Sequence, residues 1–427
     1  MTVRLLEWTR PWPWPWILFA AALGARLVYI LQGYEIPPQD TPDYDEIALN
    51  LLRGDGFVAR DNWFGFELRS WRPPFYPFFL ALVYGVWGHS HQAVQLVQAI
   101  IGAGTVVLVY DLARRLHPQS ALLAGLLATV YGPLVTISAE VMTETWFTFL
   151  LVLSAWFLVD ATGADRMSRR SLLAGGVAIG LAALTRPVGL LFLPAFALAT
   201  FWHRGPQSLR RTLWVTLAVC CTILPWSLRN YQVHRAWVPI STHGGFILSR
   251  SNAAEPAWRQ EHGWGIEESF FHQIPSETER DRYWFRQGIS FIRSHPGTYL
   301  KLAAERFLRF WYFLRPEYNF WFVLILPFFL VGLWRYGRTE GFLLLSSFAG
   351  ISLLIFSFVL YGSTRFRLPL EPFFLLFAAA FIRDAWNCSR RTSGMLAAAL
   401  LVNLLLYWGD EPLRDLVLNL LREWNLK

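Results

Sequence analysis

The chain has 427 residues, of which 54% are hydrophobic, 17% aromatic and only 16% charged. A soluble domain of average composition carries about 25% charged residues, whereas here the apolar residues come in unbroken runs of roughly 15 to 20, about the length that crosses a bilayer. This composition excludes a soluble enzyme, a nucleic-acid binder and a disordered scaffold. The net charge of +8 comes mostly from arginine, as expected for the cytoplasmic loops of a multi-pass membrane protein.

Eleven membrane-spanning helices are predicted from the apolar runs, in chain order. They lie at about 16–34, 93–112, 121–138, 144–161, 171–185, 187–202, 212–228, 319–334, 341–361, 367–383 and 394–408. A further run, 74–88, is short and opens with two prolines, so we interpret it as a juxtamembrane helix. If it spanned the membrane, the arginine-rich loops would face outward, against the positive-inside rule. The N-terminus is then cytoplasmic and the C-terminus lies outside.

The predicted topology gathers four polar stretches on the outer face, at 35–72, 138–143, 229–318 and 362–367. We expect one helical membrane domain, 1–408, followed by a short amphipathic tail, 409–427. The outer loop 35–92 would contain juxtamembrane helices, and the outer loop 229–318 would cap a site, because long loops tend to be functional or to hold their own helices. Within the cap, 299–311 is expected to be an interfacial helix rather than part of the site.

The first outer loop contains a predicted amphipathic helix. Thr41 and Pro42 suit its start and Gly54 suits its end. Asp40 lies just ahead of this start, where the helix dipole favours an ionised carboxylate, and Asp43 and Tyr44 lie in the first turn. These acids are either a capping cluster on a surface helix or functional groups.

Two further groups at the outer surface have functional and structural interpretations. Arg72, directly before Pro73-Pro74, either holds a lipid phosphate through its guanidinium fork or is an interfacial arginine. Glu140 and Glu144 flank the outer ends of two spans, where carboxylates are usually functional or paired.

The remaining outer candidates are basic. Arg186 turns the chain between two spans, which an interfacial anchor would also explain. Arg365 and Arg367 break the positive-inside trend, so an anion is expected to balance them: a phospholipid headgroup, a carboxylate or a substrate phosphate. His243 lies near other outer polar residues, and a lone histidine is more often structural than a ligand.

These residues form a pattern of short motifs in a fixed order. They are Asp40-x-x-Asp43-Tyr44, Arg72-Pro-Pro-x-Tyr-Pro, Glu140-x-x-x-Glu144, Thr185-Arg186-Pro187, Pro225-Trp226-x-x-Arg229-Asn230 and Arg365-x-Arg367-x-Pro369. With them the chain resembles the GT-C fold glycosyltransferases that use polyprenyl-phosphate sugars, such as protein O-mannosyltransferases and lipid A aminoarabinose transferases. The resemblance covers roughly 24–372.

The resemblance implies roles for individual residues. Asp40 corresponds to the catalytic acid, with Asp43 and Glu144 as further catalytic candidates. Arg72, Arg365 and Arg367 would bind the carrier phosphate. The acceptor or the sugar would meet Tyr44, Glu140 and Arg186. The chain departs from many relatives in having Thr41 after Asp40, where they have adjacent Asp-Glu.

The expected reaction is a single inverting displacement at the anomeric carbon, with Asp40 as general base for an acceptor hydroxyl. A divalent metal, Mg²⁺ or Mn²⁺, held by Asp43, Glu144 or His243 would help neutralise the leaving phosphate, but the spacing does not require one. Expected partners are a polyprenyl-phosphate-linked sugar, membrane lipids, and an acceptor lipid, glycan or protein. The expected location is the bacterial inner membrane, with the site on the extracytoplasmic side.

The alternative is a transporter or flippase that moves a lipid-linked substrate without catalysis. Such proteins usually carry several ionisable residues at mid-membrane depth, whereas Arg26 is the main one here.

Overall fold

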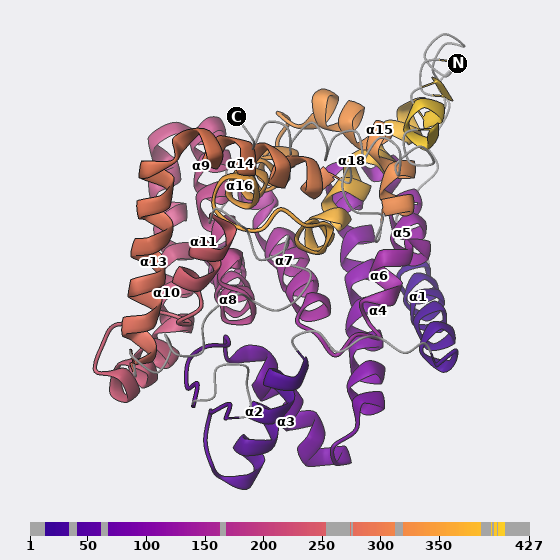
Figure 1. The fold of residues 1–427 in the computed structure, drawn as a ribbon. Helices are drawn as coiled ribbons and strands as arrows, with labels where there is room; N and C mark the ends of the chain where they lie inside the picture. Colours follow the sequence, from indigo (N-terminus) through magenta and orange to yellow (C-terminus); the bar gives the residue numbers. More distant parts are fainter. Residues whose placement is uncertain are drawn as a thin grey trace, which may run out of the picture.

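The computed structural model describes residues 13–33, 41–60, 67–162, 168–252, 274, 276–311, 319–385, 394, 397–398 and 400–405, which form a helical protein (Figure 1). Asp40 and the predicted tail 409–427 lie outside these residues. The main helices are α1 (Trp14–Leu31), α2 (Thr41–Arg53), α3 (Phe75–Trp87), α4 (His91–Leu116), α5 (Ala121–Val130), α6 (Gly132–Thr136), α7 (Glu144–Leu158), α8 (Arg169–Thr185), α9 (Phe192–Arg204), α10 (Ser208–His234), α11 (Gly244–Ser251), α13 (Glu277–Ser294), α14 (Pro296–Trp311), α15 (Asn319–Tyr336), α16 (Phe342–Phe358), α17 (Thr364–Arg367) and α18 (Glu371–Ala385).

The helices confirm a polytopic membrane protein. Three helical segments in the described part of the chain are long and apolar enough to cross a membrane: Trp14–Leu31, His91–Leu116 and Pro187–His234. Shorter apolar helices include Glu144–Leu158, Phe320–Tyr336 and Phe342–Phe358. The helix predicted to lie at the membrane surface is α3, which has 13 residues. The number of eleven spans stays a prediction.

Small residues let the central helices pack closely. A Cβ atom added at Gly176 of α8 would lie 2.6 Å from the backbone oxygen of Val215 in α10, and one added at Gly180 would lie 2.6 Å from Thr222. Close backbone approach at small residues is the usual way in which membrane helices associate, because lipid and leucine are equally apolar. The glycines of α8 therefore fix its distance from α10.

Arg26 lies on the buried face of α1 and is 1% exposed. Its guanidinium donates hydrogen bonds to the backbone oxygen of Leu134 at 2.9 Å and to the hydroxyl of Ser138 at 3.2 Å. Leu134 lies in the short helix α6 and Ser138 lies just after its end, and an unsatisfied carbonyl in an apolar environment is costly. Arg26 thus stabilises the broken segment that leads to α7.

Helices α2 and α3 lie together at one end of the molecule, beside the start of α4 (Figure 1). The apolar side of α2 does not stay free: Tyr44 and Ala48 pack with Tyr76 and Leu80 of α3 in one buried cluster. Ile47, next to them, joins the main core. The predicted amphipathic helix is therefore fixed on α3, and its first turn faces the loops that precede α7.

Candidate active site

One large cavity lies among the segments that were predicted to share the outer face. Its volume is about 840 Å³. The lining comes from α2, the Arg72-Pro73 turn, the segment before α7, the α8–α9 junction, residues 239–247, α14 and residues 356–368. Seven of the predicted site residues line it: Tyr44, Arg72, Glu140, Glu144, Arg186, His243 and Arg365. Segments far apart in the sequence thus meet at one cavity.

Glu144 is the centre of a charged cluster in this cavity. It is the first residue of α7, where the positive end of the helix dipole favours a carboxylate, and it is 1% exposed. Its Oε1 atom accepts a hydrogen bond from Nη1 of Arg186 at 2.7 Å and another from Nε of Arg365. One buried carboxylate therefore orients two guanidinium groups, from the α8–α9 junction and from α17.

Arg72 is held by a second carboxylate. Its Nε and Nη2 atoms lie 2.8 Å and 2.7 Å from Oδ2 of Asp43 in α2. Its guanidinium also lies 5.2 Å from the centre of the Tyr44 ring, a cation–π distance. Asp43 does not itself line the cavity, so in this geometry it fixes the orientation of Arg72.

The segment before Arg72 is anchored by residues that come much later in the sequence. The carboxylate of Glu277 in α13 accepts the backbone N–H groups of Arg69 at 2.8 Å and Ser70 at 3.1 Å. Arg229 of α10 donates to the backbone oxygen of Arg69 at 2.6 Å. The Trp226-x-x-Arg229-Asn230 motif therefore positions the Arg72 segment and does not line the cavity.

A neighbouring contact fixes α13 to α11. The carboxylate of Asp281 accepts the backbone N–H of Gly245 at 2.6 Å. Burial of this carboxylate raises its pKa to about 6, although the hydrogen bond from Gly245 opposes the shift. The loop that presents His243 to the cavity is thus attached to α13.

Arg367 lies elsewhere, although it was predicted to bind the carrier phosphate. Its side chain is fully buried; Nε donates to Oε1 of Glu371 at 2.7 Å and Nη1 donates to the backbone oxygen of Phe310 at 2.7 Å. The guanidinium also lies 3.6 Å from the centre of the Phe322 ring. These contacts join α14, α15 and α18, so we leave Arg367 out of the phosphate site.

The predicted metal ligands do not converge. Asp43 pairs with Arg72, and Glu144 pairs with Arg186 and Arg365. His243 lies against Trp71, with ring centres 4.2 Å apart. Asp43, Glu144 and His243 form no common group of ligand atoms within the part of the chain that the structure describes. The geometry does not fit a metal held by these three, and no step of the chemistry is assigned to one.

Arg309 lines the cavity, contrary to the expectation that 299–311 is only an interfacial helix. The buried residues of α14 include Leu302, Arg306, Arg309 and Phe310, so its arginines share the apolar face. Arg306 donates to the backbone oxygens of Ser357 at 2.7 Å and Ser251 at 2.6 Å. The sequence signal was the spacing of arginines and apolar residues by three and four positions, which places them on one helix face.

The charges around the cavity favour an anionic ligand. Its described lining residues include four arginines and two glutamates. Tyr361 also lines the cavity with its phenol ring. The site therefore offers guanidinium groups and a neutral hydroxyl, a suitable set for a phosphate group.

Asp40, the predicted base, lies outside the described residues, but its chain neighbour is placed. Thr41 donates from its hydroxyl to the backbone oxygen of Val141 at 3.1 Å. Val141 directly follows Glu140, which lines the cavity. The start of α2 is therefore fixed beside this part of the cavity.

Comparisons with known proteins agree with this fold. Residues 71–228 match the family described as dolichyl-phosphate-mannose-protein mannosyltransferase. The undecaprenyl phosphate-alpha-4-amino-4-deoxy-L-arabinose arabinosyl transferase of Pseudomonas paraeruginosa is 28% identical over 227 residues, which are 49% of this chain and 39% of that protein. An uncharacterized protein of Aquifex aeolicus is 26% identical over 201 residues, which are 45% of this chain and 39% of that protein.

Solved structures match over nearly the whole chain. ArnT from Cupriavidus metallidurans, bound to undecaprenyl phosphate, aligns with a TM-score of 0.60 and 16% identity, over 92% of this chain and 64% of ArnT. The oligosaccharyltransferase of Archaeoglobus fulgidus aligns with a TM-score of 0.60 and 13% identity, over 96% of this chain and 56% of that protein. The chain thus spans less than two thirds of the length of these relatives. It is a membrane protein of the GT-C fold and a relative of the polyprenyl-phosphate-dependent glycosyltransferases.

Proposed function

We propose that the protein is a glycosyltransferase of the bacterial inner membrane. It moves a sugar from a polyprenyl-phosphate carrier to a hydroxyl group of an acceptor lipid, glycan or protein on the extracytoplasmic side. The observation that carries this proposal is the cavity whose lining contains Arg72, Arg186, Arg309 and Arg365.

The charge change of the reaction explains why arginines suit this site. The donor is a phosphate diester with one negative charge, and the released polyprenyl phosphate is a monoester whose charge approaches −2 at neutral pH, because its second pKa is about 6. Negative charge therefore grows on the phosphate as the bond to the sugar breaks. Arg72 and Arg365 are oriented in advance by Asp43 and Glu144, and such pre-oriented donors stabilise charge that develops in a transition state.

The proton of the acceptor hydroxyl needs a base, and we assign this role to Asp40. The acceptor oxygen attacks the anomeric carbon as the carbon–phosphate oxygen bond breaks, and the proton goes to the carboxylate. The leaving phosphate is a stable anion, so the second carboxylic acid that a glycosidase needs is not required. A single displacement of this kind inverts the anomeric configuration.

The remaining polar groups at the cavity would contact the sugar or the acceptor. Tyr44 and Glu140 line the cavity near the start of α2, and Arg186 lines it at the α8–α9 junction. Glu140 would then face the acceptor hydroxyl, while the arginines face the phosphate.

The sidedness follows from the predicted topology. Nucleotide sugars are cytoplasmic, whereas a lipid carrier that has crossed the membrane presents its sugar outside. With a cytoplasmic N-terminus, the cavity lies on the outer side, at the depth of a polyprenyl headgroup.

The test is carrier binding by the full chain in detergent, read as thermal stabilisation by undecaprenyl phosphate. Arg72→Ala is expected to weaken the apparent affinity about 10- to 100-fold, because a hydrogen bond to a charged group contributes about 1.5–3 kcal/mol. Arg114→Ala is the matched control, since Arg114 is exposed and forms an ion pair with Asp111 on its own helix. Equal affinities for the wild type and Arg72→Ala would remove Arg72 from the phosphate site.

A second arm separates catalysis from transport. Asp40→Asn is expected to keep carrier binding and to lose sugar transfer. Carrier binding with movement across a vesicle membrane, and no transfer to any acceptor class, would support the transporter instead.

A further inference from the structure

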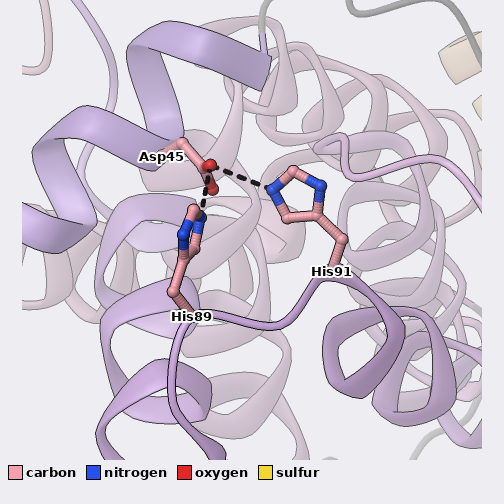
Figure 2. Close-up of side chains that lie close together, drawn as sticks. All are labelled: Asp45, His89 and His91. Carbon is pink, nitrogen blue, oxygen red and sulfur yellow. Dashed lines mark hydrogen bonds and ion pairs between the residues drawn. The ribbon is translucent and has the colours of Figure 1, made fainter.

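Asp45, His89 and His91 converge outside the cavity, at the corner where α3 ends and α4 begins (Figure 2). Asp45 comes from α2, on the opposite side of the helix from Asp43. His89 lies in the short turn between α3 and α4, and His91 is the first residue of α4. None of the three lines the cavity.

The ligand atoms of the three side chains face one another. Oδ2 of Asp45 lies 2.8 Å from Nε2 of His89 and 2.9 Å from Nε2 of His91. One ligand atom from each residue lies within 4.8 Å of the other two. In a tetrahedral zinc site with bonds of about 2.0–2.1 Å, ligand atoms lie roughly 3.3 Å apart. Side-chain shifts of less than about 1 Å would therefore admit a metal ion between them.

The surroundings hold the carboxylate in place. The Tyr84 hydroxyl donates a hydrogen bond to the other oxygen of Asp45, Oδ1, which leaves Oδ2 directed at the histidines. A partner that orients a ligand in this way is the usual second layer of a metal site.

The turn is built to present both imidazoles on the same side. Gly88 has φ of +73°, a conformation that favours glycine and lets the chain reverse after α3. Ser90 caps α4 by accepting the N–H of Ala93 at 3.2 Å. His89 and His91 flank this cap, and each side chain is 47% exposed. The ligands are thus open to ions from solvent.

We propose that Asp45, His89 and His91 form a binding site for a divalent transition metal, with Zn²⁺ as the best match. Two imidazoles and one carboxylate are borderline ligands that suit Zn²⁺ better than Mg²⁺ or Ca²⁺, which prefer oxygen. Three protein ligands leave a fourth position for water. The ion joins α2 to the α3–α4 corner and so stabilises the helix that carries Asp43 and Tyr44.

The same contacts would exist in a purely hydrogen-bonded cluster, so the experiment must detect the metal itself. The full chain, free of any histidine tag, is purified in detergent, treated with a chelator and titrated with ZnCl₂ by calorimetry. We expect one Zn²⁺ per chain with a Kd of about 1 μM or tighter, and a higher Tm in the presence of the metal. Binding weaker than about 100 μM would overturn the proposal.

Variants locate the ion. His89→Gln, His91→Gln and Asp45→Asn are each expected to weaken Zn²⁺ binding at least tenfold, whereas His295→Gln, an exposed histidine on α13's end, should bind as the wild type does. Unchanged binding in all three ligand variants would place the ion elsewhere and refute the site. If a ligand variant does not fold, Co²⁺ gives an independent readout in the wild-type chain: an intense visible spectrum indicates four-coordinate binding, and a weak octahedral spectrum contradicts it.

Discussion

Replacing Glu144 with glutamine tests the centre of the charged cluster. The substitution keeps the size of the side chain and removes its charge. The carboxylate is 2% exposed, while the side chains of Arg186 and Arg365 are 15% and 28% exposed. Without the carboxylate, two guanidinium groups lose their buried partner but keep part of their hydration.

The expected loss follows from this burial. Removing one partner of a buried ion pair typically costs 3–5 kcal/mol, and the partial hydration of both arginines puts Glu144→Gln at the lower end, about 3 kcal/mol. In thermal unfolding of the detergent-solubilised protein, this corresponds to a fall in Tm of roughly 3 °C. Glu340→Gln is the control, because Glu340 is 60% exposed and lies 3.9 Å from Arg204, so we expect less than about 1 kcal/mol.

A double-mutant cycle with Arg365→Gln measures the pair directly. Combining both changes should cost less than the sum of the two single changes, with a coupling energy of about 1–3 kcal/mol. Additive effects, or a Glu144→Gln protein as stable as the control, would refute the assignment of Glu144 as the residue that holds both arginines.

Three further predictions concern stability. Gly362→Ala should lower Tm, because a Cβ there would overlap the backbone of α14, whereas Gly350→Ala, with open space around it, should not; equal Tm values would contradict the packing. Asp281→Asn should raise stability at pH 8 by about 2–3 kcal/mol and have little effect at pH 4, because the folded-state pKa of about 6 lies above the usual value of 3.8 and the wild type therefore loses stability as pH rises from about 4 to 6; a pH-independent effect would refute it. Arg367→Met should destabilise by about 3 kcal/mol or more by leaving Glu371 buried without its partner, and a neutral effect in urea unfolding would argue against that pair.

Much of the helical architecture was predictable because a helix that crosses the membrane needs a long continuous run of apolar residues. The predicted runs up to residue 383 fall on observed helices, and α3 was distinguished by its length and prolines. The span count and the catalytic roles of the site residues stay predictions. The apolar pattern does not show which polar side chains of a turn point into the protein interior.

Arg365 and Arg367 show that limit for the site. They are two positions apart on the four-residue helix α17, and such neighbours point in nearly opposite directions. Sequence alone marks both as unusual outer arginines. Only the packing of α14 and α18 shows that Arg365 meets the cavity while Arg367 meets Glu371.

The histidines show a different limit. We singled out His243 for its polar neighbours, yet the histidines that converge with a carboxylate are His89 and His91. Their partner Asp45 lies more than 40 positions earlier. The His-x-His spacing is visible in the sequence. Only the contact between α2 and the α3–α4 corner shows that a carboxylate lies beside the two histidines.

The anchoring of the Arg72 segment bears on the order in which the site forms during synthesis. Arg69 is bonded to Glu277, a residue 208 positions later in the chain. A ribosome adds residues one at a time, so the segment before Arg72 is made long before the carboxylate that fixes it. The early helices can insert and pair by then, but the segment before Arg72 gains its final position only when α13 has been made. A nascent chain that stops before α13 would thus contain the early membrane helices and lack a finished cavity.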